Sequence, residues 1–528
     1  MAVEGWMKRG LAETLEGVAL NMRAPYFYPT STSLEISEGG YQDEMNMEKM
    51  LQETAERYPE NPAIIYEGKR ISYNNLNQFV EALAHHLQGL GIQKGDKVAI
   101  MLSNCPEFII SYFAALRLGA IAVTLNVMST SYELQHLLEN SDARVFITAD
   151  NLAKRFQDIK DTLPLCQHLI TTSGLNPGSP FDEIIRSGSV TVDFPALKGN
   201  DPAVMIYTSG LTGKPVGAVL TYNNLATQAV LLRTICNGTQ TDRCLAVIPL
   251  FHSFGAAVNM LSPICLGAGV VLTDRLTMDG IFATIQNEQV TYIAAVPRLF
   301  MGMLFHDKIK EYNLCSLRFG ITGGSAMPPE LFPELEKHLG IQVLEGYGLT
   351  ETSPCCIFTI PNRAQKSGSV GTILPGVEAK VFDDAGCEVA VGLVGELVIR
   401  GDVVMQGYYK DEAATAEVIR NGWLHTGDLA HMDEEGYVFL VGLKKRMIIT
   451  SGFNVYPKEV ELILHMHPAV VASKVIGQKD LVRGEIVKAL IVKKPGDETD
   501  EKEIMRHCRT YLSSYKVPRE VAFVATLD

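Results

Sequence analysis

The sequence contains no run of more than three basic residues and no Cys-x-x-Cys pair. With a net charge of −14, such a chain disfavours nucleic acid and anionic membranes as its main partners. The apolar stretch at residues 112–128 is interrupted by Arg117. We therefore expect no integral membrane segment.

The marks of a secreted protein are also missing. The ten cysteines are scattered through a long chain, which is typical of reduced and mostly buried thiols. Residues 1–23 carry three glutamates and lack the apolar centre of a signal peptide. These absences predict a cytoplasmic protein.

The length and pattern of the chain predict an α/β protein with more than one domain. A chain of 528 residues exceeds what one hydrophobic core usually supports. Strands and helices alternate up to about residue 370, which predicts a large N-terminal domain, residues 1–444, of layered α/β sheets. Short strands over about 371–444 indicate a small β-rich subdomain within it, and residues 445–528 indicate a small α+β C-terminal domain.

One polar loop stands out, Tyr207-Thr-Ser-Gly-Leu-Thr-Gly-Lys-Pro-Val-Gly217, between predicted strands at 204–207 and 218–221. Its glycines allow backbone N–H groups to close around an anion, its hydroxyls add donors and its lysine adds a positive charge. It is not a P-loop, because Thr208 stands where the first glycine should be and Pro215 follows Lys214. The composition favours a phosphate site, although a flexible surface turn has a similar composition.

Three later turns carry residues that suit a nucleotide. In Gly323-Gly-Ser-Ala326 the first two residues have no side chain to keep a flat ring from the backbone. In Glu345-Gly-Tyr-Gly-Leu-Thr-Glu351, Tyr347 offers an aromatic face, Thr350 a donor and Glu351 a hard oxygen ligand for Mg²⁺. In Thr426-Gly-Asp428 the carboxylate can accept both ribose hydroxyls. Each turn alone is also compatible with an ordinary structural role.

Taken together and in this order, the motifs resemble those of the adenylate-forming superfamily, which contains acyl-CoA synthetases, nonribosomal adenylation domains and luciferases. The phosphate loop of that superfamily runs Tyr-Thr-Ser-Gly-Thr-Thr-Gly-x-Pro-Lys-Gly, and here Leu211 and Val216 depart from it. The resemblance extends from about residue 48 to the end of the chain. It implies an AMP-forming carboxylic acid–CoA ligase that uses ATP, Mg²⁺ and coenzyme A, with AMP as a product.

The resemblance also assigns roles to individual residues. It implies catalytic roles for Lys214, Thr350 and Glu351, with Glu351 as the metal ligand. The implied nucleotide-binding residues are Thr208, Ser209, Gly210, Thr212, Gly213, Lys214, Gly323, Gly324, Ser325, Glu345, Gly346, Tyr347, Gly348, Thr350 and Asp428.

The same resemblance locates the acyl pocket, the CoA path and a hinge. It implies an acyl pocket at His252, Val296, Gly324 and Gly346, a pantetheine path at Ser451, Gly452 and Phe453, and an interdomain hinge at Lys445. Relatives that activate amino acids place an aspartate near His252, and none is found here. A hydrophobic aliphatic, alicyclic or aromatic acid is therefore expected. The particular acid and its chain length stay open, as does the choice between a monomer and a homodimer.

Some features depart from the superfamily pattern. Leu443 and Arg446 stand where an arginine and an aspartate are usual, and the chain ends at Asp528, where a loop with a further catalytic lysine should begin. Either the sequence is a shortened form, which we favour, or it is a natural variant, and in both cases poor adenylation is expected. Two other functions remain open: an adenylating enzyme that passes its acyl group to a carrier protein, and a non-catalytic protein that binds nucleotide or acyl-adenylate.

Overall fold

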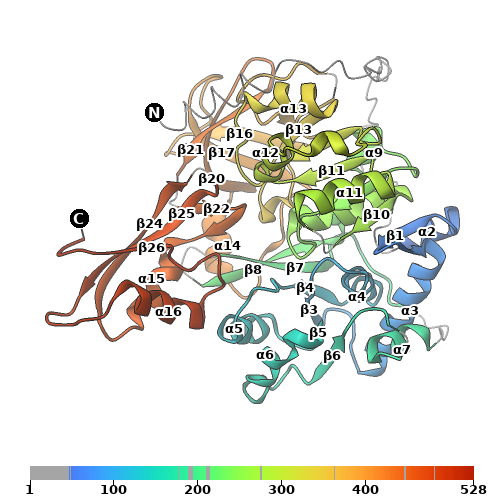
Figure 1. The fold of residues 1–528 in the computed structure, drawn as a ribbon, viewed down its shortest axis with the longest axis horizontal. Coiled ribbons are helices and arrows are strands. Elements are labelled where there is room, and N and C mark those ends of the chain that lie inside the picture. The colour runs from blue at the N-terminus through green and yellow to red at the C-terminus, as the bar shows by residue number, and fades with distance from the viewer. Residues whose placement is uncertain are drawn as a thin grey trace. The chain divides into compact units, whose positions relative to one another are not determined.

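The computed structural model describes residue 47 and residues 49–176, 178–187, 194–209, 214–273, 276–361, 363–444, 447–480 and 482–527. Within these residues the chain forms two large sheets, a smaller antiparallel sheet and a C-terminal sheet with helices (Figure 1). This arrangement agrees with the predicted fold class. Among the described helices, none has the length and apolar character that crossing a bilayer requires.

The first large sheet has nine strands in the described residues and is parallel over its central part. Its order is β15-β14-β13-β12-β11-β9-β10-β1-β2. The strands are β1 Pro62–Tyr66, β2 Lys69–Ser72, β9 Arg243–Ala246, β10 Gly269–Leu272, β11 Tyr292–Ala295, β12 Phe319–Thr322, β13 Gln342–Tyr347, β14 Ile357–Phe358 and β15 Thr372–Ile373.

The second large sheet has seven strands in the described residues, in the order β18-β8-β7-β4-β3-β5-β6. Strands β7 and β8 pair antiparallel, so the phosphate-loop motif joins two neighbouring strands as the sequence predicts. The strands are β3 Lys97–Met101, β4 Ile121–Thr124, β5 Ala143–Ala149, β6 His168–Thr172, β7 Pro202–Ser209, β8 Pro215–Thr221 and β18 Gly407–Tyr408.

Helices cover the outer faces of these sheets and fill the space between them. Apolar residues of α11, α12 and α13 pack on one face of the nine-stranded sheet, and those of α5 and α6 on one face of the seven-stranded sheet. The remaining faces share a core with α3, α4, α8 and α10. The helices of these layers are α2 Met50–Arg57, α3 Tyr73–Gly89, α4 Pro106–Arg117, α5 Ser131–Ser141, α6 Ala153–Gln157, α7 Pro180–Arg186, α8 Tyr222–Ala229, α9 Leu231–Thr234, α10 Ser262–Leu266, α11 Met278–Glu288, α12 Pro297–Leu304 and α13 Leu331–Leu339.

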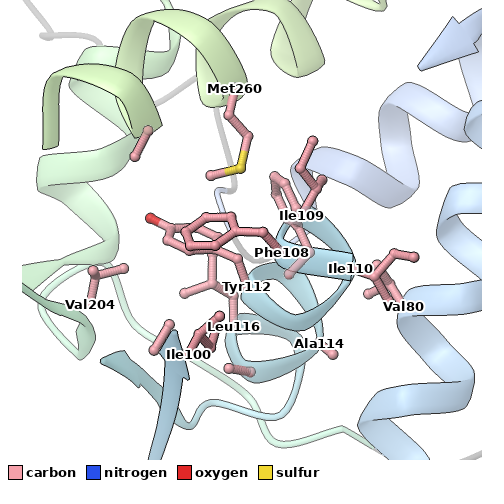
Figure 2. Packing of buried hydrophobic residues seen from close by; sticks show 14 of the residues in the cluster. Val80, Ile100, Phe108, Ile109, Ile110, Tyr112, Ala114, Leu116, Val204 and Met260 are labelled. Carbon is pink, nitrogen blue, oxygen red and sulfur yellow. The ribbon is translucent and has the colours of Figure 1, made fainter. Parts of the chain in front are cut away.

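Helix α4 lies at the centre of this shared core. All of its residues are buried, and Figure 2 shows Ile110 facing Val80 of α3 while Phe108 and Tyr112 lie near Met260. A helix that is apolar around its circumference must be surrounded on every side. Its one charged C-terminal residue, Arg117, is paired with Glu81 of α3 at 3.1 Å. The apolar stretch at residues 112–128 is therefore divided in the structure: its first part ends α4, and β4 follows after a turn.

The β-rich subdomain and the C-terminal segment complete the described structure. The former contains β16 Val377–Phe382, β17 Gly395–Gly401, α14 Glu412–Val418, β19 Ile419–Arg420, β20 Trp423–Met432 and β21 Val438–Leu443. The latter contains β22 Ile448–Thr450, β23 Phe453–Val455, α15 Pro457–His465, β24 Val470–Asp480, β25 Gly484–Lys493, α16 Glu501–Tyr511 and β26 Glu520–Phe523. The C-terminal segment has a hydrophobic core of its own.

Two elements have an unusual form. The alternation of strands and helices in the sequence predicts a single helix from Asn223 to about Thr234, but α8 and α9 are separated at Val230. Next to the break, the Ser262 hydroxyl donates to the Gln228 carbonyl at 2.9 Å and so takes up an acceptor of the helix. The chain at 255–261 forms a π-helix, η4 Gly255–Leu261, a rare element that often marks functional sites.

Candidate active site

A single large cavity of about 350 Å³ brings most of the predicted motifs together. Its polar part is lined by Thr208 at the end of β7, by Tyr347 at the end of β13, and by Asp428 of β20. Thr350 and Glu351, in the short helix η6 Thr350–Thr352, line it too. Ligands of α/β sheets bind at the carboxyl ends of strands. Thr208 and Tyr347 lie at such ends, and Thr350 lies just beyond one.

Close backbone approaches around β13 require glycine at two of the predicted positions. A Cβ on Gly348 would lie 1.6 Å from the Pro354 carbonyl oxygen, and a Cβ on Gly323 would lie 3.0 Å from that of Gly346. Both Gly323 and Gly348 line the cavity, together with Gly324 and Gly346. Glycine therefore lets the β12 and β13 turns approach each other without side chains between them.

Tyr347 and Asp428 form the best defined polar pair of the cavity. The Tyr347 hydroxyl donates to Asp428 Oδ2 at 2.5 Å. Burial raises the pKa of Asp428 to about 6, and the neighbouring carboxylates of Glu351 and Glu396 act in the same direction. An ionised Asp428 therefore gains when further donors reach it, as the two hydroxyls of a ribose would.

Glu351 is half-buried in the same wall and has one strong donor. The Tyr408 hydroxyl donates to Glu351 Oε1 at 2.6 Å, and burial raises the pKa of the carboxyl. Thr350 lies beside it, with its hydroxyl 3.5 Å from that of Ser253. Among the described residues, no group of three or more His, Cys, Asp or Glu side chains could hold a metal alone. A cation at Glu351 would need ligands from a bound molecule.

The phosphate-loop motif is only partly described. Thr208 lines the cavity and Ser209 ends β7, whereas Lys214 is exposed and is not one of the described lining residues. Gly210, Thr212 and Gly213 lie outside the described residues. The contacts predicted for Gly210, Thr212, Gly213 and Lys214 stay predictions.

Glu345 and Ser325 lie apart from the main cavity. Glu345 lines a smaller cavity of about 150 Å³ behind β13, together with Arg363 and Lys366. Burial raises the pKa of Glu345 to about 7, and Met327 N donates to it at the long distance of 3.5 Å. Ser325 follows Gly324 and is half-buried, without lining either cavity. Their roles toward a nucleotide stay predictions.

The other end of the main cavity is apolar. His252 lines the cavity, and Phe254 N donates to His252 Nδ1 at 3.2 Å. Burial lowers the pKa of His252 to about 4, so the ring is neutral at pH 7. Beyond it the walls come from α9 and the residues after it, the π-helix η4, and β12 and β14 with the chain before β14. They are Leu231, Leu232, Ile235, Cys236, Val258, Ile321, Cys355 and Phe358.

The C-terminal segment contributes to the cavity. Gly452, Asn454 and Tyr456 line it, and a Cβ on Gly452 would lie 2.9 Å from Val296 Cγ1. Arg298 Nη1 donates to Ser451 Oγ at 3.4 Å, and the ring of Phe453 stacks on Tyr515 with centroids 4.6 Å apart. The predicted CoA path thus lies against Val296, a predicted residue of the acyl pocket. The predicted hinge, Lys445, lies outside the described residues.

Sequence reasoning missed several residues of this cavity. Tyr408 lines it and donates its hydroxyl to Glu351. Tyr456 lines it without a predicted role, and the apolar wall of α9 is equally unmarked. Their common feature is contact across long sequence separations, such as the 57 residues between Glu351 and Tyr408. The only local signal for Tyr408 is its place in a short strand, β18, that pairs with β8.

Known protein families match the chain over most of its length. A family model described as AMP-binding enzyme matches residues 51–409, and one described as AMP-binding enzyme C-terminal domain matches residues 459–528. The chain belongs to the AMP-binding enzyme family.

Relatives and solved structures agree with this membership. A long-chain-fatty-acid–CoA ligase of Bacillus subtilis is 32% identical over 511 residues, which cover 90% of this chain and 90% of that protein. A double mutant of the o-succinylbenzoate CoA synthetase of the same organism, bound with a product analogue, has a TM-score of 0.81 and 29% identity, over 91% of this chain and 95% of its own. An anthranilate CoA ligase in complex with anthranoyl-AMP has a TM-score of 0.71 and 27% identity, over 92% of this chain.

These findings confirm the predicted superfamily, the fold and the class of enzyme. This AMP-binding enzyme is an acid–thiol ligase of the AMP-forming acyl-CoA synthetase type, which uses ATP and CoA. The roles of single residues and the domain boundary at residue 444 are not tested by the comparisons and stay predictions.

Proposed function

We propose that this AMP-binding enzyme activates a hydrophobic carboxylic acid in its main cavity and transfers the acyl group to CoA. In the first step a carboxylate oxygen attacks the α-phosphorus of ATP, and pyrophosphate leaves. In the second step the CoA thiolate attacks the acyl carbonyl carbon, and AMP leaves. The observation that carries this proposal is one cavity with a polar end and an apolar end.

The polar end suits a nucleotide. Tyr347 presents its ring to the base between Gly346 and Gly348, and the ionised Asp428 accepts the ribose hydroxyls. Thr208 donates to the phosphates, and Lys214 of the same loop supplies a positive charge. Fixed donors and charges of this kind stabilise the charge that develops on the leaving pyrophosphate.

The donor set at Glu351 fits Mg²⁺. Magnesium is commonly held by one or two carboxylates together with the phosphates of a substrate, and here Glu351 lies in the wall with Thr350 and Thr208. When bound, the ion neutralises phosphate charge. Glu351 would hold it through the carboxylate oxygen that Tyr408 does not contact. Because Asp428 and Glu351 are both acidic, polyphosphate binding without a cation is disfavoured.

The apolar end suits the acyl group. Its walls are aliphatic, aromatic and thiol groups, and the neutral His252 lines the same cavity. No described lining residue of this end carries an acid that could pair with the ammonium of an amino acid. The size and apolar lining favour an aliphatic or aromatic acid, and the relatives that act on long-chain fatty acids point to the aliphatic class.

The test is formation of an acyl-CoA thioester. The chain is incubated with ATP, CoA, Mg²⁺ and a panel of saturated fatty acids of increasing length, benzoic acids and amino acids, and products are identified by mass spectrometry. We expect thioesters from fatty acids, none from amino acids, and none when EDTA replaces Mg²⁺. Acyl-adenylate without any thioester would instead favour transfer to a carrier protein. Absence of both products, together with no thioester from supplied acyl-adenylate and CoA, would contradict the proposal and favour a binding protein.

A further inference from the structure

Three charged side chains are buried together where the C-terminal segment meets helix α5. Lys516 Nζ donates to Glu133 Oε1 at 2.8 Å and to Glu459 Oε1 at 2.6 Å. Each of these side chains is only 7% exposed. Glu133 belongs to the large domain, whereas Glu459 and Lys516 both belong to the C-terminal segment. The cluster therefore joins the two parts by a buried ion pair.

Glu133 is held both by its own helix and by a second residue of the C-terminal segment. It forms a capping box with Thr130, in which Thr130 N donates to Glu133 Oε2 at 2.9 Å and Glu133 N donates to Thr130 Oγ1 at 3.2 Å. The Ser513 hydroxyl donates to the same carboxylate at 2.6 Å. One oxygen of Glu133 is thus used by the helix cap and Ser513, and the other is directed at Lys516.

The charged states of Glu133, Glu459 and Lys516 depend strongly on one another. Burial alone disfavours the ionised form of Glu133, but Lys516 and the hydrogen bonds hold its pKa below the usual value. Burial likewise opposes the charge of Lys516, yet the neighbouring carboxylates raise its pKa. Burial raises the pKa of Glu459. Removing one member of a buried ion pair leaves the other charge without compensation, which is far more disruptive than losing an exposed pair.

Contacts around the cluster connect it to the cavity. The Thr130 hydroxyl donates to the Tyr511 carbonyl at 3.1 Å, and the rings of Tyr132 and Tyr511 meet edge to face at 5.2 Å. Tyr515, next to Lys516, stacks on Phe453, and the chain at Gly452 packs on Val296. A shift of Lys516 away from Glu133 would therefore be felt at the turn that closes on the acyl pocket.

We propose that Glu133 is a positioning residue for acyl transfer to CoA: through Lys516 it holds the C-terminal segment in the arrangement in which Gly452, of the predicted CoA path, lines the main cavity. This inference rests on the proposed function, because it assigns Glu133 to the second of its two steps. It gives Glu133 no contact with substrate.

The experiment measures the two steps separately in the Glu133→Gln variant. Adenylation is followed by acid-dependent exchange of pyrophosphate into ATP, and transfer is followed by thioester formation from supplied acyl-adenylate and CoA. Glutamine keeps an oxygen for the helix cap but loses the charge. We expect transfer to fall by about tenfold or more, in the range that couplings of 1–3 kcal/mol produce, while adenylation changes less than twofold.

Two further variants make the result specific. Glu139→Gln removes an exposed carboxylate from the same helix and should leave both steps unchanged. In a chain that already carries Lys516→Met, adding Glu133→Gln should lower the rate of transfer little further, because the two residues act as one unit. Equal losses in both steps, or no loss of transfer in Glu133→Gln, would overturn the inference. Absence of transfer in the unmodified chain would count against the proposed function instead.

Discussion

At the scale of single residues, an ionised Asp428 lowers the stability of the protein without ligand, but it is the acceptor that we propose for the ribose of the nucleotide. Burial raises its pKa to about 6, so the fold favours the protonated carboxyl more than the unfolded chain does. The protonated carboxyl therefore stabilises the folded protein. This contribution is fully present below about pH 4, near the ordinary pKa of an aspartate, and is lost as the pH rises through 6. Above that pH the ionised carboxylate destabilises the protein until donors reach it.

The variant Asp428→Asn should separate these two effects. Without ligand we expect its free energy of unfolding at pH 7 to exceed that of the unmodified chain by about 1–3 kcal/mol, with little difference at pH 4. Affinity for AMP should fall by about 10- to 100-fold, because a charged acceptor is lost. Urea denaturation at both pH values and calorimetric titration with AMP measure these changes.

An exposed neighbour supplies the control for this variant. Glu434→Gln lies in a turn that leads out of the same strand and should alter neither stability nor affinity. If Asp428→Asn proves less stable than the unmodified chain at pH 7, burial is not what raises the pKa. If its affinity for AMP is unchanged, Asp428 does not bind the ribose.

The residues that the sequence identified are those whose type and local spacing carry the chemistry. Tyr347, Glu351 and Asp428 stand in short motifs with glycines beside them, and the structure brings all three to one cavity. The hydroxyl of Tyr408 on Glu351 could not be foreseen, because nothing in the neighbourhood of either residue reports a contact formed only in the folded chain.

At the scale of elements, the break between α8 and α9 shapes the apolar end of the cavity. Helix α9 and the residues that follow it contribute Leu231, Leu232, Ile235 and Cys236 to the wall. The sequence predicts most helices well because caps such as Ser72 and Thr130 are local signals. It misses this break and the π-helix, since both depend on contacts such as Ser262 with the Gln228 carbonyl.

A larger side chain on α9 should shorten the acids that the cavity accepts. Leu231 is half-buried and lines the apolar end, so in Leu231→Trp the added ring fills space that is otherwise open. We expect kcat/KM for long fatty acids to fall by about tenfold or more, since each excluded methylene is worth about 1 kcal/mol. Short acids should be used as before, as steady-state rates across the length series will report.

The complementary variant is Leu231→Ala, which enlarges the same wall and should preserve or increase activity toward long acids. A uniform loss of activity at every chain length in Leu231→Trp would mean that α9 supports the fold without facing the acyl group. An unchanged length preference would mean that the acyl chain occupies another part of the cavity.

At the scale of the whole molecule, the chain contains cores of unequal size on either side of residue 445. The order of motifs along the sequence predicts their convergence on one nucleotide, and the family membership agrees with that prediction. The docking of the C-terminal segment could not be predicted, because Glu133 and Lys516 are 383 residues apart and neither stands in a motif. Local patterns account for the sheets, whereas the contacts that dock this segment, including the ion pair of Glu133 with Lys516, form only in the folded chain.

This organisation predicts that the C-terminal segment can lose its structure while the large domain keeps its own. Ile504 of α16 is fully buried in the separate core of the segment, and Ile504→Ala should destabilise that core by about 2–5 kcal/mol. In hydrogen exchange we expect protection to fall over residues 447–527 and to persist in β3, β4 and β5 of the seven-stranded sheet.

The matched control is Ile293→Ala, which removes an equal volume from the nine-stranded sheet. It should lower protection in the large domain and preserve it over residues 447–527. Equal losses in both regions for either variant would mean that residues 47–527 unfold as one cooperative unit, and the boundary at residue 444 would then have no energetic meaning.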